Sequence, residues 1–252
     1  MAGIKACRPR RRIGKNIFVA WLIYSLGLLA NVWAEGQKLL PADWAWEPVF
    51  TVPMLKGEFR VDGVLADNEW LYSTQIGGLI DGNTLMQTNQ PGRFLLGYRG
   101  TDLYLGFETQ RPKGSGPPRI LVDKPGWSPT PLWVQNDNME VWLAPFTEGV
   151  KMSGMMEPRY AIAANAAGAY SHDMTGWDRA QIPRELKYAP ILRTEHWQGE
   201  MVAPWGVLSQ MRATEKKNRP AEGVQWKGVF FFHQTTPFLS MVGPQPLRWS
   251  LS

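Results

Sequence analysis

Residues 94–107 read Phe-Leu-Leu-Gly-Tyr-Arg-Gly-Thr-Asp-Leu-Tyr-Leu-Gly-Phe and contain the clearest hairpin signal of the chain. Two apolar runs, 94–98 and 103–107, flank the polar segment Arg99-Gly100-Thr101-Asp102. Apolar runs of strand length joined by a short segment containing glycine are typical of antiparallel β-hairpins. This stretch therefore predicts two neighbouring antiparallel strands.

Similar short apolar runs recur along the chain and are separated by turn residues. They lie at residues 59–61, 139–143, 160–164, 200–203 and 229–232. Helical patterns are confined to one turn at 67–71 and another at 205–211, whereas residues 113–131 and 147–158 are loops rich in Pro and Gly. Many short strands with long Pro/Gly-rich connections predict an all-β, antiparallel β-sandwich.

The N-terminus has the three parts of a secretory signal peptide. A basic region that contains six Lys and Arg residues precedes the apolar run 17–30, and small residues at Val32 and Ala34 flank Trp33. This pattern predicts export, cleavage after Ala34 and a secreted or periplasmic protein. In the alternative interpretation residues 16–34 remain as an uncleaved membrane anchor, because 19 uncharged residues are just enough to span a bilayer.

Charge and composition exclude several classes of function. Removing residues 1–34 leaves 21 Lys and Arg against 22 Asp and Glu, so the remaining chain carries about −1 and offers no basic surface for nucleic acid. The single cysteine, Cys7, lies within the signal, which excludes disulfides and cysteine-based metal sites from the exported part. The three histidines have no ligand spacing, and no phosphate-binding or nucleotide-binding motif is present.

Five segments, in order, resemble the motifs of family 9 carbohydrate-binding modules. They are Phe-Arg-Val-Asp-Gly-Val-Leu-Ala-Asp-Asn-Glu-Trp (59–70), Asp-Leu-Tyr-Leu (102–105), Asp-Asn-Met-Glu-Val-Trp-Leu (137–143), Asn-Ala-Ala-Gly (165–168) and Trp-Gln-Gly-Glu-Met-Val-Ala-Pro-Trp (197–205). The resemblance spans about residues 59–232. We accordingly expect a sandwich domain over 59–252 that follows an extended lead-in over 35–58.

The resemblance implies a non-catalytic module that binds a poly- or oligosaccharide and works beside a secreted glycoside hydrolase in polysaccharide degradation. The chain contains 13 Trp residues, and flat aromatic rings suit the apolar C–H faces of sugars. Three of these residues, Trp70, Trp142 and Trp205, lie in apolar alternating contexts, and we expect them in the core.

Two site residues follow from the resemblance. The stacking Trp and the sugar-binding Glu of the family correspond to Trp133, in a Pro-rich loop, and to Glu140, in the strand that follows. The spacing between them is one residue longer than in the family, and Trp127 competes with Trp133 for the stacking role.

The other two site residues correspond less well. The family's sugar-binding Arg is replaced by Ala163, which leaves Asn165 as the polar candidate beside it, or as a residue that only serves a turn. A second stacking Trp is expected near the C-terminus. Either Trp249 takes its place, or the final loop and strand are missing and the domain is truncated.

Two further possibilities stay open. One is an exported β-sandwich that has lost sugar binding and serves as a structural or interaction domain. The other is bound calcium, which the resemblance implies and which needs six to eight oxygen ligands; such oxygens lie in loops or at strand ends at Asp62, Asp67, Asp81, Asp137 and Asp173. Glycoside hydrolysis is disfavoured, because Asp137 and Glu140 are spaced to project from opposite faces of a strand.

Overall fold

The chain divides into two compact units, Met1–Trp46 and Glu47–Ser252. The computed structural model describes residues 49–81, 88, 90–111, 113–133, 136–145, 160–174, 186–204, 225–235, 238–242 and 247–251, all in the second unit. The expected signal peptide, residues 35–48 and the loop 147–158 lie outside this part. Within it, no helix has the length and apolar character needed to cross a membrane.

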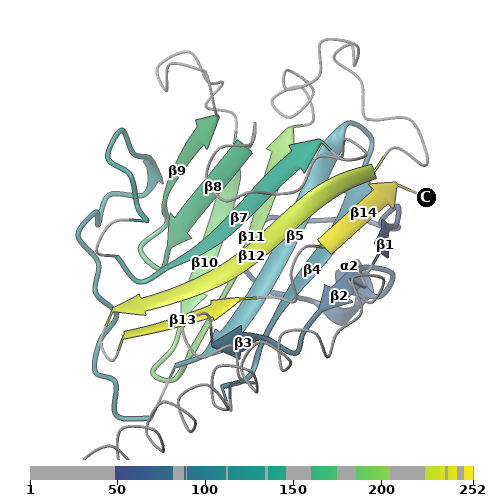
Figure 1. Ribbon diagram of the computed structural model, residues 1–252. Coiled ribbons are helices and arrows are strands. Elements are labelled where there is room, and N and C mark those ends of the chain that lie inside the picture. Colours follow the sequence, from purple (N-terminus) through teal and green to yellow (C-terminus); the bar gives the residue numbers. More distant parts are fainter. Residues whose placement is uncertain are drawn as a thin grey trace, which may run out of the picture. The chain divides into compact units, whose positions relative to one another are not determined.

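The second unit contains two β-sheets that lie in two layers (Figure 1). The nine-stranded sheet has the order β1 (Val49–Val52), β14 (Leu247–Leu251), β12 (Gln225–Thr235), β7 (Asn138–Pro145), β8 (Tyr160–Asn165), β9 (Ala169–Met174) and β6 (Gly126–Trp127), with β13 (Phe238–Val242) beside β12 and β3 (Ile80–Asp81) beside β13. The five-stranded sheet has the order β10 (Lys187–Leu192), β11 (His196–Pro204), β5 (Asp102–Gln110), β4 (Gly92–Arg99) and β2 (Thr74–Ile76). All strand pairs are antiparallel except β1 with β14 and β6 with β9.

This arrangement confirms the predicted antiparallel β-sandwich. The predicted hairpin is β4 and β5, in which Arg99 pairs with Asp102 across a two-residue turn. Gly100 in that turn has φ +58°, a left-handed conformation that glycine adopts without steric cost. The only helix in the described residues is the predicted turn, α2 (Asp67–Trp70).

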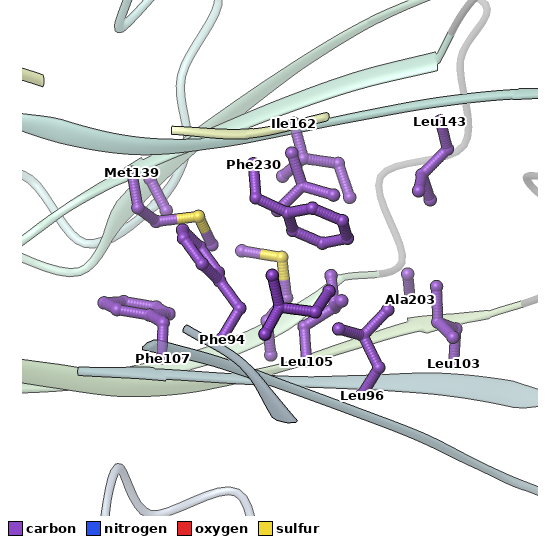
Figure 2. Close-up of a cluster of buried hydrophobic side chains, with 14 of the residues drawn as sticks. Phe94, Leu96, Leu103, Leu105, Phe107, Met139, Leu143, Ile162, Ala203 and Phe230 are labelled. Carbon is purple, nitrogen blue, oxygen red and sulfur yellow. The ribbon is translucent and has the colours of Figure 1, made fainter. Parts of the chain in front are cut away.

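The main core lies between the two sheets. In Figure 2, Met139, Leu143, Ile162 and Phe230 of the nine-stranded sheet point toward Phe94, Leu96, Leu103, Leu105, Phe107 and Ala203 of the five-stranded sheet. The side chains alternate along each strand, so the residues between them point to the outer faces. Phe94 stacks on Phe232 with ring centroids 4.4 Å apart, which joins the two layers at one end.

A second, smaller cluster covers the outer face of the five-stranded sheet. Leu55 and Trp70 are buried there, together with Leu95 of β4. Two glycines of the sheet make room for them: a Cβ at Gly97 would lie 2.4 Å from the Leu55 side chain, and one at Gly106 would lie 2.9 Å from the Trp70 ring. The prediction that Trp70 belongs to the core is confirmed.

The predicted strand at residues 59–61 is wrong. This segment has no strand partner; Phe59 instead packs edge-on against Trp70 and Tyr104, at centroid distances of 5.0 and 4.5 Å. The turn that follows is bound by a side chain, because the backbone N–H groups of Asp62 and Gly63 both donate to Oε2 of Glu200 at 3.0 Å. These hydrogen bonds hold the segment as a cover on the sheet rather than as one of its strands.

Candidate functional site

The alternation of side chains along β7 places Glu140 and Trp142 on the outer face of the nine-stranded sheet. Met139, Val141 and Leu143 point into the core, so Glu140 and Trp142 point away from it. The prediction that Trp142 belongs to the core is therefore wrong: its ring is half-buried and lies outside the sandwich. Trp205, the other tryptophan expected in the core, lies outside the described residues.

The neighbouring strand β12 adds two rings to the same face. Phe231 lies opposite Glu140 in the register, and His233 follows two residues later. Phe231 contacts the Trp142 ring at a centroid distance of 5.1 Å and stacks on the His233 ring at 5.5 Å with an interplanar angle of 17°. The three rings thus form a continuous row, in which each is half-buried.

Glu140 holds both ends of this row. Its Oε2 accepts a hydrogen bond of 3.0 Å from Trp142 Nε1, and its Oε1 lies 3.4 Å from His233 Nε2. The Glu140 side chain is 3% exposed. We call Glu140, Trp142, Phe231 and His233 the Glu140 cluster. A carboxylate that accepts a hydrogen bond from the indole and lies beside the imidazole nitrogen fixes the orientation of both rings.

Trp133 lies on the same face. It is half-buried and packs against a small apolar cluster of Leu132, Ala163 and Ala169. Ala163 is the register partner of Glu140 on β8. The structure therefore brings the two main predicted site residues, Trp133 and Glu140, to the same face of neighbouring strands.

Polar side chains of the sheet hold the long loop that carries Trp133. The amide nitrogen of Asn138 donates to the Leu132 carbonyl at 2.9 Å, and the Leu132 N–H donates to Ser171 Oγ at 3.1 Å. The Asn165 amide nitrogen donates to the Val122 carbonyl at 2.8 Å. These side chains come from three adjacent strands, so the loop is bound along its length rather than at its ends alone.

Asn165 also closes the turn after β8. It is 0% exposed, and its Oδ1 accepts hydrogen bonds from the backbone of Ala167 and Ala169, each at 3.1 Å. All of these partners are backbone groups, which agrees with the turn-forming alternative. A direct contact between Asn165 and sugar stays a prediction.

The remaining aromatic candidates lie elsewhere. Trp127 is in β6 and packs against the main core, which favours Trp133 over Trp127 as a surface ring. Trp249 is in the middle of β14, opposite Trp226 near the start of β12, whereas His233 is near the end of that strand. The structure does not bring the backbone of Trp249 beside the Glu140 cluster.

Metal sites are not evident in the part of the chain that the structure describes, where no three His, Asp or Glu side chains gather in a group that could hold an ion. Two of the expected calcium ligands have other partners. Asp62 Oδ1 accepts from the Val64 N–H at 2.9 Å, and Asp137 Oδ2 lies 3.9 Å from Nη2 of Arg111 in a buried ion pair. Calcium binding stays a prediction.

Sequence reasoning missed Trp142, Phe231 and His233 as site residues. The signal was present in the phase of the alternation: with Met139, Val141 and Leu143 directed inward, Glu140 and Trp142 had to share the outer face. The pairing of β7 with β12 could not be predicted in this way, because no local sequence pattern indicates which strands become neighbours in the sheet.

No protein-family model and no curated protein matches this sequence. Solved structures do match its fold. A family 9 carbohydrate-binding module from Caldicellulosiruptor kristjanssonii in complex with cellotriose has a TM-score of 0.50 and 13% identity over 81% of this chain and 93% of its own. The same kind of module in complex with glucose has a TM-score of 0.50 and 13% identity, and covers 80% of this chain and 95% of that one.

A candidate carbohydrate-binding protein from Bacteroides uniformis has a TM-score of 0.54 and 13% identity over 81% of this chain and 99% of that one. Identity this low establishes likeness of fold and leaves function to be argued from the site. The resemblance to family 9 carbohydrate-binding modules that the sequence motifs predicted is therefore confirmed at the level of the fold.

Proposed function

We propose that this chain is a non-catalytic carbohydrate-binding protein and that its sugar site is the outer face of the nine-stranded sheet, around the Glu140 cluster and Trp133. The observation that carries the proposal is the row of Trp142, Phe231 and His233 rings oriented by one buried carboxylate, with Trp133 on the same face. The likeness to modules solved with cellotriose and glucose supports it.

The chemistry of this face suits a sugar ring. Aromatic rings provide apolar contact area at low conformational cost, and a sugar places its axial C–H groups on such surfaces. The edge of the His233 ring, which is 28% exposed, offers a hydrogen bond to a hydroxyl group at the rim of the row, and the buried Glu140 carboxylate orients that ring from beneath. Trp133 and the Trp142–His233 row would then contact different parts of one ligand.

Each carboxylate of this region has partners of its own. Glu140 interacts with Trp142 and His233, whereas Asp137 faces Arg111. A glycosidase places two carboxyl groups on either side of the bond that it breaks, about 5–9.5 Å apart. Binding without bond cleavage is therefore the activity that this arrangement favours.

The proposal includes a cellular context. The N-terminal signal would bring the chain to the periplasm or the medium, where a poly- or oligosaccharide would be its ligand and a secreted glycoside hydrolase its functional partner. A calcium ion, held by aspartates of the loops, would stabilise the domain.

Titration of the purified chain with cellotriose and with glucose tests the proposal. Intrinsic Trp fluorescence and calorimetry would report binding, and Trp142→Ala and Trp133→Ala would each weaken it several-fold, because an aromatic contact contributes about 0.5–1.5 kcal/mol beyond the apolar area that it buries. Tyr72, which lies in the turn after α2 and is 51% exposed, provides the matched control Tyr72→Ala, which should bind as the parent does.

One observation favours a second candidate, an interaction domain that has lost sugar binding. The Glu140 side chain is almost completely buried, and the residue facing it on β8 is the small, buried Ala163 rather than a charged side chain. If the folded chain gave no response to a broad set of oligosaccharides, this second candidate would replace the first.

A further inference from the structure

A cleft lies on the five-stranded sheet, which contributes no residue to the Glu140 cluster. Its volume is about 970 Å³, and its lining comes from β2, β4, β5 and β11 and from residues of the connections before β3, β4 and β11. Arg93, Glu108 and His196 alternate with the core residues Phe94, Phe107 and Trp197, so they belong to the outer face of the five-stranded sheet. The cleft occupies the part of this face that Leu55 and Trp70 leave uncovered.

A connected set of side chains organises the cleft. Arg93 and Glu108 are register partners on β4 and β5, and Arg93 Nε lies 2.5 Å from Glu108 Oε1. The second oxygen of Glu108 lies 3.6 Å from His196 Nε2, and Arg93 Nη1 donates to Gln75 Oε1 at 3.5 Å. Four strands thus contribute to one network around the Glu108 carboxylate, and each of its members retains hydrogen-bonding capacity.

The rim adds further polar groups on a fixed backbone. The Gln110 N–H donates to the Pro91 carbonyl at 3.0 Å, and the amide of Gln90 donates to the Gln110 carbonyl. Glu195 is exposed at the edge of the cleft, and among the described residues its carboxylate has no hydrogen bond or ion pair. The opening is therefore lined by both amide and carboxylate side chains.

These groups suit a neutral ligand that both donates and accepts hydrogen bonds. The charges of Arg93 and Glu108 cancel, and Glu195 adds a negative charge, so the cleft does not favour an anion. No three acidic or histidine side chains in the described residues gather as a metal site would require. Hydroxyl groups are the simplest chemistry that matches both properties, because each one donates and accepts at once. The volume lies within the range of about 300–1,000 Å³ that is usual for small-molecule sites.

We propose that this cleft is a second glycan-binding site, which recognises hydroxyl groups through Arg93, Glu108 and His196. It differs from the first proposed site in its chemistry, since among the described residues that line it only His196 has an aromatic ring, and binding would depend on hydrogen bonds rather than on stacking. Two sites on opposite sheets would let one molecule hold two segments of a polysaccharide, which strengthens attachment through effective concentration.

Histidine resonances offer a separate readout for each site, because the chain has only three histidines. His196 lies in the cleft, His233 in the Glu140 cluster, and His172 is buried in the sandwich.

In an NMR titration of the purified chain with cellotriose, xylotriose and maltotriose, we expect at least one trisaccharide to shift the His196 signals. Arg93→Ala and Glu108→Gln should each weaken that response at least about tenfold, as expected when hydrogen bonds to charged groups are lost. Arg99→Ala, on the same strand but outside the cleft, is the matched control and should leave it unchanged.

The two proposals fail separately in this experiment. Shifts of His196 that disappear in the Arg93 and Glu108 variants and persist in Trp142→Ala support the second site, even if His233 never responds. Shifts confined to His233, a response of His196 that the Arg93 and Glu108 variants leave unchanged, or no response of His196 to any of the three sugars would overturn it. Thermal melts of each variant identify any loss that comes from unfolding.

Discussion

The indole Nε1 of Trp70 donates a hydrogen bond of 2.9 Å to Oε1 of Glu200, a residue 130 positions further along the chain. The other carboxylate oxygen accepts from the backbone of Asp62 and Gly63, and Glu200 is 0% exposed. One side chain therefore joins the segment 59–70 to β11. The first and the last of the five sequence motifs are in direct contact because of it.

Removing this contact should destabilise the domain. In Glu200→Gln the amide group presents one acceptor oxygen to three N–H donors, so at least one buried donor loses its partner, at a cost of about 1–3 kcal/mol. Trp70→Phe removes a single donor and should cost less. Urea unfolding followed by fluorescence measures both, and Lys187→Ala, at an exposed position of β10, is the control. Unchanged midpoints in both variants would contradict the role that we assign to Glu200.

The same carboxylate makes stability depend on pH. Burial raises the pKa of Glu200 to about 7 from its ordinary 4.5, despite three hydrogen bonds that favour the ionised form. The folded chain then keeps a proton that the unfolded chain has already lost, so this contribution to stability is fully present below pH 4.5 and is lost as pH rises toward 7. It amounts to about 3 kcal/mol at most. Unfolding free energies at pH 5 and pH 7.5 should differ less in Glu200→Gln than in the parent; equal differences would contradict the assignment.

Gly97 and Gly106, which lie beneath Leu55 and Trp70, should not tolerate a side chain. Gly97→Ala places a Cβ 2.4 Å from both Cγ and Cδ2 of Leu55, and Gly106→Ala places one 2.9 Å from the Trp70 ring. Overpacking of this kind costs about 1–3 kcal/mol. Gly77→Ala is the matched control, since its Cβ would meet nothing within 4 Å and its φ is not in the left-handed region. Thermal melts should show lower midpoints for the first two variants and a near-parental midpoint for the third.

The variant Asn165→Ala distinguishes a structural role of this residue from a role in sugar binding. Asn165→Ala removes two hydrogen bonds within its turn and one to the Val122 carbonyl, all at a buried position, and should destabilise the domain by about 1–3 kcal/mol. A purely structural role predicts that the remaining folded protein binds cellotriose as the parent does. Parental stability combined with weakened binding would assign Asn165 to the sugar instead.

Much of this fold could be predicted from local pattern. The hairpin around Gly100, the single turn at 67–70 and the strand at 139–143 follow from alternation, turn chemistry and spacing, which act over a few residues. Residues 59–61 have the composition of a strand but are not one, because Glu200, far away in sequence, captures the turn beside them. A pattern over a few residues cannot predict a hydrogen bond to a side chain so distant in the sequence.

The residues of the candidate site also fall into two groups, those that the sequence predicts and those that only the structure identifies. The resemblance indicated Trp133 and Glu140, and the structure brings them to one face of the sheet. Phe231 and His233 join them only because β12 is the neighbour of β7 with a particular register. Trp142 was assigned to the core from its apolar surroundings, although the phase of its own strand opposed this. Two features are hardest to predict from a single sequence: which strands pair with each other, and which aromatic residues point outward.

The pairing of β1 with β14 has a consequence for the order of folding. Val49 is the register partner of Arg248, so the first strand of the nine-stranded sheet acquires its neighbour only after nearly the whole domain has left the ribosome. Val52, at the end of β1, is 0% exposed, which means that this late step also completes part of the core. Closing so long a loop is slow compared with forming the β4–β5 hairpin. Chains that stop short of residue 247 should therefore accumulate as partly folded species with an apolar edge that proteases and chaperones can recognise.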